Sequence, residues 1–258
     1  MSWIPPVRAR LAERLIFNFR LPPEAMARLL PEPWLAPQVV NGFGIASFCM
    51  LDLRGITVAP LPTALGLPSI SCAPRFGVVD LSASPPQPAV YVTERWSSSA
   101  FGSWFTSLGF SAPHPHARAT WQRTGDAAQV SVVSRRRGPV VSARVRRAET
   151  FRSAAFESAA AFAAFLAEGV SSYGLSRYPG RLTKVDLHKA DNTYTPLAVD
   201  ELDGPVIREW QAAGGVLDSA FRTSGGRYEW TYHGLTDVLP PACPSPVAVA
   251  GVGTASSF

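Results

Sequence analysis

Two of the four histidines in the chain, His114 and His116, lie on either side of Pro115. Imidazole changes its protonation state near neutral pH, so either side chain could move a proton between substrate atoms. The flanking prolines favour an extended backbone, along which residues two apart point to the same side. The alternative is a pair of loop histidines without a catalytic task. No cluster of His or carboxylate residues lies nearby in the sequence, so no metal site is expected.

A strand predicted over residues 13–21 ends in an arginine that could hold an anion. Side chains alternate along this segment, and Arg20 falls on the face opposite Phe19. If that face lines a pocket, the guanidinium could donate hydrogen bonds to a carboxylate, an enolate or a carbonyl oxygen. In the alternative interpretation, Arg20 forms a surface ion pair with Glu24 or Glu13. The first interpretation makes Arg20 a catalytic candidate.

Three more polar residues are candidates for substrate binding. Glu94 lies in an apolar segment, where a buried carboxylate would need a cation such as Arg75 or Arg20. Such a pair could position a substrate, or it could only tie two strands together. His188 ends an alternating segment and is either a pocket residue or a structural histidine that bonds Asp186.

Aromatic residues are concentrated between residues 96 and 121. Most are expected in the core, but some would line any cavity, and we assign Trp104 and Trp121 to it. Thr106 and Ser107 could donate hydrogen bonds to a ligand, although no base adjacent in sequence would activate Ser107 as a nucleophile. The chain has no Gly-x-Ser-x-Gly elbow, phosphate loop or dinucleotide fingerprint, so no cofactor is expected.

The elements that must position these side chains are mostly strands. A loop is expected over residues 54–68 and a short helical stretch over 100–108. One long helix is expected to begin at Ser153 or Ser158 and to end near Glu168. A short helix is expected over residues 24–30. Strands are predicted over residues 13–21, 42–53, 89–96, 117–123, 129–135, 140–147, 181–188 and 228–232. This pattern predicts a single α+β, mainly β domain over residues 1–237, built on a curved sheet, with a Pro-, Ala- and Gly-rich tail over 238–258.

The formal charge of +5 comes from scattered arginines and does not indicate a nucleic-acid partner. The densest run, Arg135, Arg136 and Arg137, lies beside a Gly-Pro turn, and Arg144 and Arg146 share one face of the next strand. This arrangement is typical of a solvated hairpin. The three cysteines, Cys49, Cys72 and Cys243, are too widely spaced for a zinc site or a disulfide framework, and the first two are expected to be buried thiols. No leader or membrane-spanning stretch is evident, so the expected location is the cytoplasm.

Several motifs, in this order along the chain, resemble the acetoacetate decarboxylase-like superfamily. Phe19-Arg20 is followed by Leu-Pro-Pro-Glu-Ala-Met-Ala-Arg-Leu-Leu-Pro-Glu-Pro-Trp, and residues 104–110 read Trp-Phe-Thr-Ser-Leu-Gly-Phe. Residues 165–173 read Phe-Leu-Ala-Glu-Gly-Val-Ser-Ser-Tyr, and residues 113–117 read Pro-His-Pro-His-Ala; both are similar to an uncharacterised branch. The resemblance covers roughly residues 8 to 235. It implies a β-barrel, or curved antiparallel sheets with a few helices, around a pocket.

The chain departs from the true decarboxylases at their reactive amine. Those enzymes use a lysine that an adjacent cation and desolvation make nucleophilic. The positions that match the lysine pair are Thr106 and Ser107, which cannot form a Schiff base. Residues 42–51 and 69–79 lack the carboxylates that the resemblance would place there, and only Arg20 carries over.

The sequence therefore predicts a cofactor-independent enzyme of the cyclase, lyase or isomerase type that acts on an apolar carbonyl compound, such as a natural-product intermediate. Arg20 would stabilise negative charge on oxygen, and His114 or His116 would be the acid or base. The alternative is a non-catalytic protein that binds a small molecule in the same pocket. Neither interpretation fixes whether the chain forms a homo-oligomer.

Overall fold

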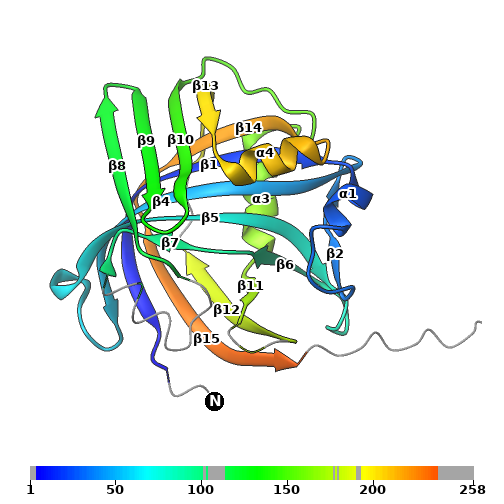
Figure 1. The fold of residues 1–258 in the computed structure, drawn as a ribbon, viewed down its shortest axis with the longest axis horizontal. Helices are drawn as coiled ribbons and strands as arrows, with labels where there is room; N and C mark the ends of the chain where they lie inside the picture. Colours follow the sequence, from blue (N-terminus) through cyan, green and yellow to red (C-terminus); the bar gives the residue numbers. More distant parts are fainter. Residues whose placement is uncertain are drawn as a thin grey trace, which may run out of the picture.

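The computed structural model describes residues 4–100, 103, 114–176, 178, 180–189 and 193–237. Long, curved strands dominate it, as Figure 1 shows. The strands are β1 (Val7–Leu21), β2 (Leu35–Pro37), β3 (Val39–Val40), β4 (Phe43–Val58), β5 (Leu67–Asp80), β6 (Gln87–Val92), β7 (Trp96–Ser97), β8 (Ala117–Thr124), β9 (Ala127–Ser134), β10 (Gly138–Arg147), β11 (Ser171–Leu175), β12 (Arg181–Lys189), β13 (Thr195–Asp203), β14 (Val216–Thr223) and β15 (Arg227–Asp237). The helices are α1 (Pro23–Ala27), the 3-10 turn η1 (Thr63–Leu65), α3 (Ala159–Glu168) and α4 (Pro205–Ala212).

The strand pairings close a barrel. The order β4-β5-β6-β11-β12-β15-β1 returns to its start because β1 also pairs with β4 along most of its length. The first residues of β1 pair with β15, and its later residues pair with β14. From β14 the chain of pairings continues through β13, β10, β9 and β8, which form a second sheet beside the barrel (Figure 1). The fold is therefore α+β and mainly β, as the sequence predicts.

The alternation of β1 separates the barrel interior from the outer core. Leu15, Phe17 and Phe19 are fully buried on one face, in a cluster with the second sheet and with Trp210 of α4. The rings of Phe19 and Trp210 meet edge to face at 5.4 Å. The opposite face carries Ile16, which belongs to a separate cluster with residues of α3. Polar side chains of β1 on this second face are consequently directed into the barrel.

Helix α3 lies against the interior face of the barrel (Figure 1). Ser158 caps it by accepting a hydrogen bond from the Ala161 amide at 3.1 Å. Phe162 is fully buried and stacks on Phe221 of β14 with ring centroids 4.2 Å apart. Gly77 of β5 makes room for the helix, because a Cβ there would lie 2.7 Å from Cζ of Phe165. The helix therefore anchors one wall of the interior.

Most of the predicted elements are confirmed, with shifted boundaries. The expected loop over 54–68 is shorter than predicted, because β4 runs to Val58 and β5 begins at Leu67. The expected strand over 89–96 is interrupted, since β6 ends at Val92 and β7 holds only Trp96 and Ser97. The resemblance placed a strand at residues 69–79, which corresponds to β5, whereas β11, β13, β14 and α4 were not predicted. Most of segment 100–108 and all of segment 238–258 lie outside the described residues, and Cys49 and Cys72 are buried free thiols as expected.

Candidate active site in the barrel

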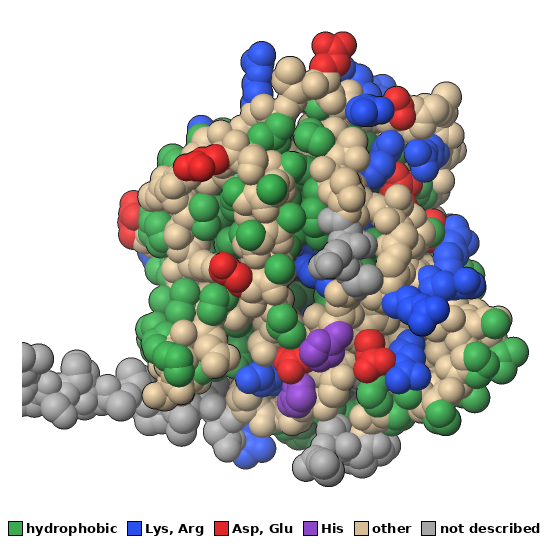
Figure 2. Space-filling model, turned by 180° about the vertical axis from the view of Figure 1, so that it is seen from behind, with side chains coloured by type: hydrophobic (Ala, Val, Ile, Leu, Met, Phe, Trp, Pro, Cys, Tyr) green, Lys and Arg blue, Asp and Glu red, His purple; other side chains and the backbone are tan. Residues whose placement is uncertain are grey.

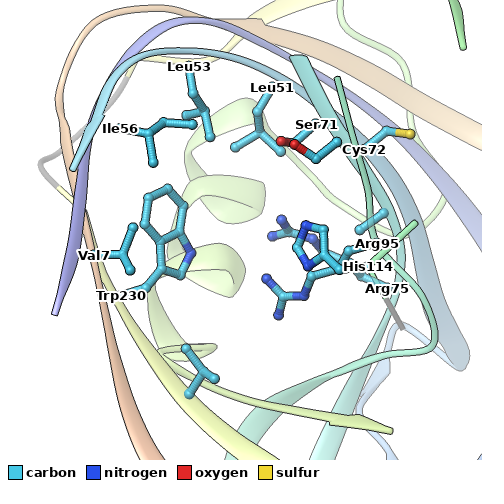
Figure 3. A pocket seen from close by; sticks show the side chains of 13 residues that line it. Val7, Leu51, Leu53, Ile56, Ser71, Cys72, Arg75, Arg95, His114 and Trp230 are labelled. Atoms are coloured by element: carbon cyan, nitrogen blue, oxygen red, sulfur yellow. The ribbon is translucent and has the colours of Figure 1, made fainter. Parts of the chain in front are cut away.

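A cavity of about 100 Å³ lies inside the barrel. We call it the main cavity. Figure 3 shows nitrogen atoms of Arg75, Arg95 and His114 gathered on one side of it, with the Trp230 indole facing them across the space. The remaining lining residues are Val7, Leu51, Leu53, Ile56, Ser71, Cys72, Ala73, Ser97 and Val185. The wall is thus mostly apolar, with one strongly basic end.

Strand register explains why these residues meet. Cys49 of β4 pairs with Ala73 of β5, and Ser47 pairs with Arg75, so all four share one face of the sheet. The next residues of β4 on this face are Leu51 and Leu53, which form the apolar wall. Arg75 is therefore directed inward by the same alternation that directs Phe76 into the outer core.

The two arginines carry charge that the cavity does not neutralise. No Asp or Glu is among its lining residues, and the Nε atoms of Arg75 and Arg95 have no hydrogen-bond partner in the described part of the chain. Burial lowers the pKa of Arg75. Burial and the charge of Arg75 together lower the pKa of Arg95 to about 9. With a pKa of about 9, Arg95 remains cationic at neutral pH, so an anionic or electron-rich oxygen would be stabilised beside it.

His114 is uncharged in this setting. Burial, and then the neighbouring Arg95, lower its pKa to about 3. Its Nδ1 atom is buried and finds no partner among the residues that the structure describes. A neutral imidazole with a free nitrogen can accept a proton, but a pKa of about 3 makes it a weak base until negative charge develops on an oxygen nearby and raises that pKa.

Of the residues that the sequence points to, Arg75 and His114 lie in the main cavity. Arg20 faces the same side of the barrel but lies at its far end, where its Nη1 is 3.3 Å from Oδ1 of Asp218. Asp218 is fully buried and also accepts the backbone N–H of Ala154 at 2.8 Å. Arg20 thus pairs with Asp218 and with neither Glu24 nor Glu13. The same carboxylate binds the backbone at Ala154.

Glu94 lies away from both arginines that the sequence offers as partners. Its carboxylate is 2.6 Å from the guanidinium of Arg137, an exposed residue next to the turn before β10. The expected pair with Arg75 or Arg20 is therefore wrong. Burial raises the pKa of Glu94, and Arg137 opposes that rise.

The other candidates lie outside the main cavity or outside the described residues. Trp121 packs on the outer core and donates its indole N–H to Glu13 at 3.2 Å. His116 is half-buried and bridges to Ser97 through its backbone without lining the cavity. His188 is exposed on the outer face of β12, and Asp186 bonds His233 instead, at 2.8 Å. The assignments of Trp104, Thr106 and Ser107 fall on residues that are not described.

A second, smaller space shares Arg75 with the main cavity, and the sequence did not predict it. We call it the inner chamber; it has a volume of about 40 Å³. Arg14, Cys49 and Lys189 line it together with Arg75, and residues of α3 close it. Arg14 donates from Nη2 to Sγ of Cys49 at 3.2 Å. The alternation of side chains along β1 is enough to place Arg14 on the interior face. The position of Lys189 beside it depends on how β12 pairs with other strands, which the sequence does not show.

The inner chamber has unusual protonation states. Burial, followed by the charges of Arg14 and Arg75, lowers the pKa of Lys189 to about 7. Burial alone would raise the pKa of the Cys49 thiol, but Arg14 and Arg75 lower it below its ordinary value. An uncharged Lys189 amine is therefore accessible near neutral pH.

Two of the exposed arginines of the second sheet are paired with carboxylates. Arg144 pairs with Glu201 at 3.2 Å and Arg146 pairs with Asp200 at 3.1 Å. Figure 2, which views the molecule from behind, shows acidic side chains interspersed among the basic ones along this side. This agrees with a solvated hairpin face.

The described residues form neither a metal site nor a membrane-spanning helix. No group of three or more His, Cys, Asp or Glu residues there could hold a metal ion. No helix in the same part of the chain is long and apolar enough to cross a membrane.

No protein-family model and no curated protein matches the chain. Solved structures do match over almost the whole of it. Acetoacetate decarboxylase from Legionella pneumophila aligns with a TM-score of 0.62 at 13% identity, over 92% of this chain and 90% of that one. The enduracididine biosynthesis enzyme MppR, complexed with the condensation product of pyruvate and imidazole 4-carboxaldehyde, aligns with a TM-score of 0.59 at 16% identity, over 92% and 90%. An acetoacetate decarboxylase-like enzyme from Sphingomonas wittichii RW1 gives 0.58 at 13% identity, over 93% and 94%.

These identities are low, so the comparison bears on the backbone arrangement, which the motifs in the sequence also indicate. The chain has the acetoacetate decarboxylase-like fold.

Proposed function

We propose that the protein is an enzyme that converts a small, apolar carbonyl compound in the main cavity, by proton transfer, cyclisation or elimination. The observation that carries this proposal is the pair of uncompensated guanidiniums, Arg75 and Arg95, at one end of an otherwise apolar space. A carbonyl oxygen that gains negative charge during the reaction is the species such an end stabilises best. The apolar wall and Trp230 would hold the hydrocarbon part.

His114 supplies the proton-transfer step in this proposal. Its neutral imidazole lies beside the two arginines (Figure 3). It would remove a proton from the carbon next to the carbonyl, while Arg75 and Arg95 hold the enolate oxygen. A nearby cation keeps an enolate low in energy, which lowers the barrier for proton removal. In this proposal Arg75 and Arg95, and not Arg20, stabilise the negative charge on oxygen, because Arg20 already pairs with Asp218.

The proposal does not use a Schiff base. The resemblance in the sequence matches Thr106 and Ser107 to the lysine pair of the decarboxylases, and neither side chain can form an imine. The fold is compatible with other chemistry, since one of the similar structures is an enzyme of enduracididine biosynthesis. A biosynthetic intermediate with a carbonyl group and an apolar body is the substrate class that we propose.

Deuterium exchange tests the proposal directly. Cyclohexanone is a suitable first probe, and NMR in D₂O would follow loss of its α-protons. The wild-type protein should accelerate exchange, and His114→Asn should lower the rate by roughly 10²–10⁴-fold, which is typical for loss of a general base. His188→Asn, at an exposed site, is the matched control.

Two outcomes would overturn the enzyme proposal. If His114→Asn exchanges the α-protons at the wild-type rate, His114 is not the general base. Saturable binding of cyclohexanone and related ketones, without exchange or turnover in the wild type, would instead support the non-catalytic binding protein.

A further inference from the structure

The inner chamber holds more buried positive charge than its residues neutralise. Arg14 is 1% exposed, and its Nε and Nη1 atoms have no hydrogen-bond partner within the described ranges. Arg75 adds a second guanidinium and Lys189 an amine. Among the described residues that line the chamber there is no Asp or Glu. Even a Cys49 thiolate would balance only one of the two guanidiniums and leave the other without an anion among these residues.

Lys189 is held in place within this space. Its Nζ donates a hydrogen bond to the backbone carbonyl of Leu166 in α3, at 2.9 Å. Its neighbour on the same face of β12, Leu187, also lines the chamber. The chain contains only one other lysine, Lys184, which lies on the other face of β12 with its Nζ 5.6 Å from the centre of the Tyr173 ring.

We propose that Lys189 is a carbamylation site, at which the amine binds carbon dioxide covalently as a carbamate. The lone pair of the uncharged Nζ attacks the carbon of CO₂, an N–C bond forms, and one C–O π bond becomes the carboxylate. One proton leaves Nζ for solvent, so one amine and one CO₂ give one carbamate anion and one proton. No oxidant, reductant or further reactant is needed.

The carbamate satisfies the groups that the chamber leaves unmatched. Its carboxylate can accept hydrogen bonds from the free Nε and Nη1 donors of Arg14 and from Nε of Arg75. Its remaining N–H can keep the bond to the Leu166 carbonyl. The chamber volume of about 40 Å³ suits a triatomic group, because one water molecule needs about 10–15 Å³. The carbamate therefore adds a negative charge beside the two buried guanidiniums.

The amine is available for this reaction near neutral pH, because burial and the two arginines lower the pKa of Lys189 to about 7. The site is separate from the substrate region of the main cavity except for the shared Arg75. The carbamate forms without substrate, so its presence can be tested whatever the outcome for the proposed enzyme.

The first experiment is ¹³C NMR of the full-length protein equilibrated with ¹³C-bicarbonate. We expect one protein-bound carbamate signal per chain, which methylation with trimethyloxonium and peptide mass spectrometry should locate at Lys189. Lys189→Arg and Lys189→Met should lose the signal, and Lys184→Arg should keep it. Arg14→Met should raise the bicarbonate concentration for half-occupancy about tenfold or more, because charge-assisted hydrogen bonds are lost.

A second readout uses the two lysines as an internal comparison. Reductive methylation with formaldehyde and cyanoborohydride should label Lys189 in CO₂-free buffer, and bicarbonate should slow that labelling severalfold without slowing Lys184. The proposal is overturned by any of three results: no carbamate signal in wild-type protein at saturating bicarbonate, a signal that persists in Lys189→Arg, or methylation of Lys189 at equal rates with and without bicarbonate.

Discussion

Replacement of Arg95 by methionine should make the ligand-free protein more stable and its ligand binding weaker. Arg95 lies in the main cavity beside Arg75, with no carboxylate among the lining residues. The fall of its pKa from 12.5 to about 9 corresponds to roughly 5 kcal/mol against the charged form, at about 1.36 kcal/mol for each tenfold change. Water in the cavity screens part of this energy, so we expect Arg95→Met to raise the free energy of unfolding by about 1–3 kcal/mol.

The assays are chemical unfolding and calorimetric titration on the same variant. A gain of 1–3 kcal/mol should appear as a Tm increase of about 3–10 °C for a chain of this size. Loss of one charge-assisted hydrogen bond should weaken binding of a carboxylate analogue, such as cyclohexanecarboxylate, by roughly 10–100-fold. Arg144→Met is the control, because that exposed residue pairs with an equally exposed Glu201 and should change stability by less than about 0.5 kcal/mol.

The reasoning fails if Arg95→Met destabilises the protein, or if it is neutral in stability and binds the analogue as tightly as wild type. Either result would show that the Arg95 charge is neutralised, or that it does not face the ligand. A stabilised variant with weakened binding is the pattern expected where a site keeps an unfavourable charge for function.

Three other variants test different parts of the structure. His114→Asn should make the protein less sensitive to mild acid. The pKa of His114 is about 3 in the fold and about 6.5 in an unfolded chain. Between these pH values the unfolded state binds more protons, so the stability of the wild type falls by up to about 1.36 kcal/mol for each unit by which the pH is lowered. Urea unfolding from pH 7 to pH 4.5 should show a shallower decline in the variant, and an unchanged slope would count against the buried imidazole. Phe162→Ala should cost about 3–5 kcal/mol, since the ring is fully buried against Phe221; a loss below 1 kcal/mol in urea unfolding would show that α3 is not anchored there. Asp218→Ala should cost about 3–5 kcal/mol by leaving Arg20 unpaired while ketone exchange persists in the folded protein, whereas loss of exchange at full stability would return Arg20 to the catalytic site.

Local patterns in the sequence predicted a good part of the architecture. The alternation around Arg20 identified β1, and the apolar side of α3 identified that helix, with Ser158 as one of its two predicted caps. Arg75 and His114, which the sequence offered as separate candidates, line the same cavity. In these cases a residue and its near neighbours along the chain carry the whole signal.

Features that depend on distant pairings could not be read from the sequence. The barrel closes because β1 pairs with both β4 and β15, which are far apart in the chain. Lys189 faces Arg14 only because of that closure, and Glu94 finds Arg137 across a hairpin instead of a cavity arginine. Only the resemblance indicated β5, because prolines and a glycine interrupt its pattern, although Pro74 lies at a regular position opposite Phe48.

A crystal structure of the protein with cyclohexanecarboxylate tests the central claim most directly. We predict the carboxylate within hydrogen-bond distance of Arg75 and Arg95, with the ring against Trp230 and Leu51. A ligand bound only in the outer groove between β10, β13 and β14, or a main cavity that stays free of it at saturating concentration, would contradict the claim.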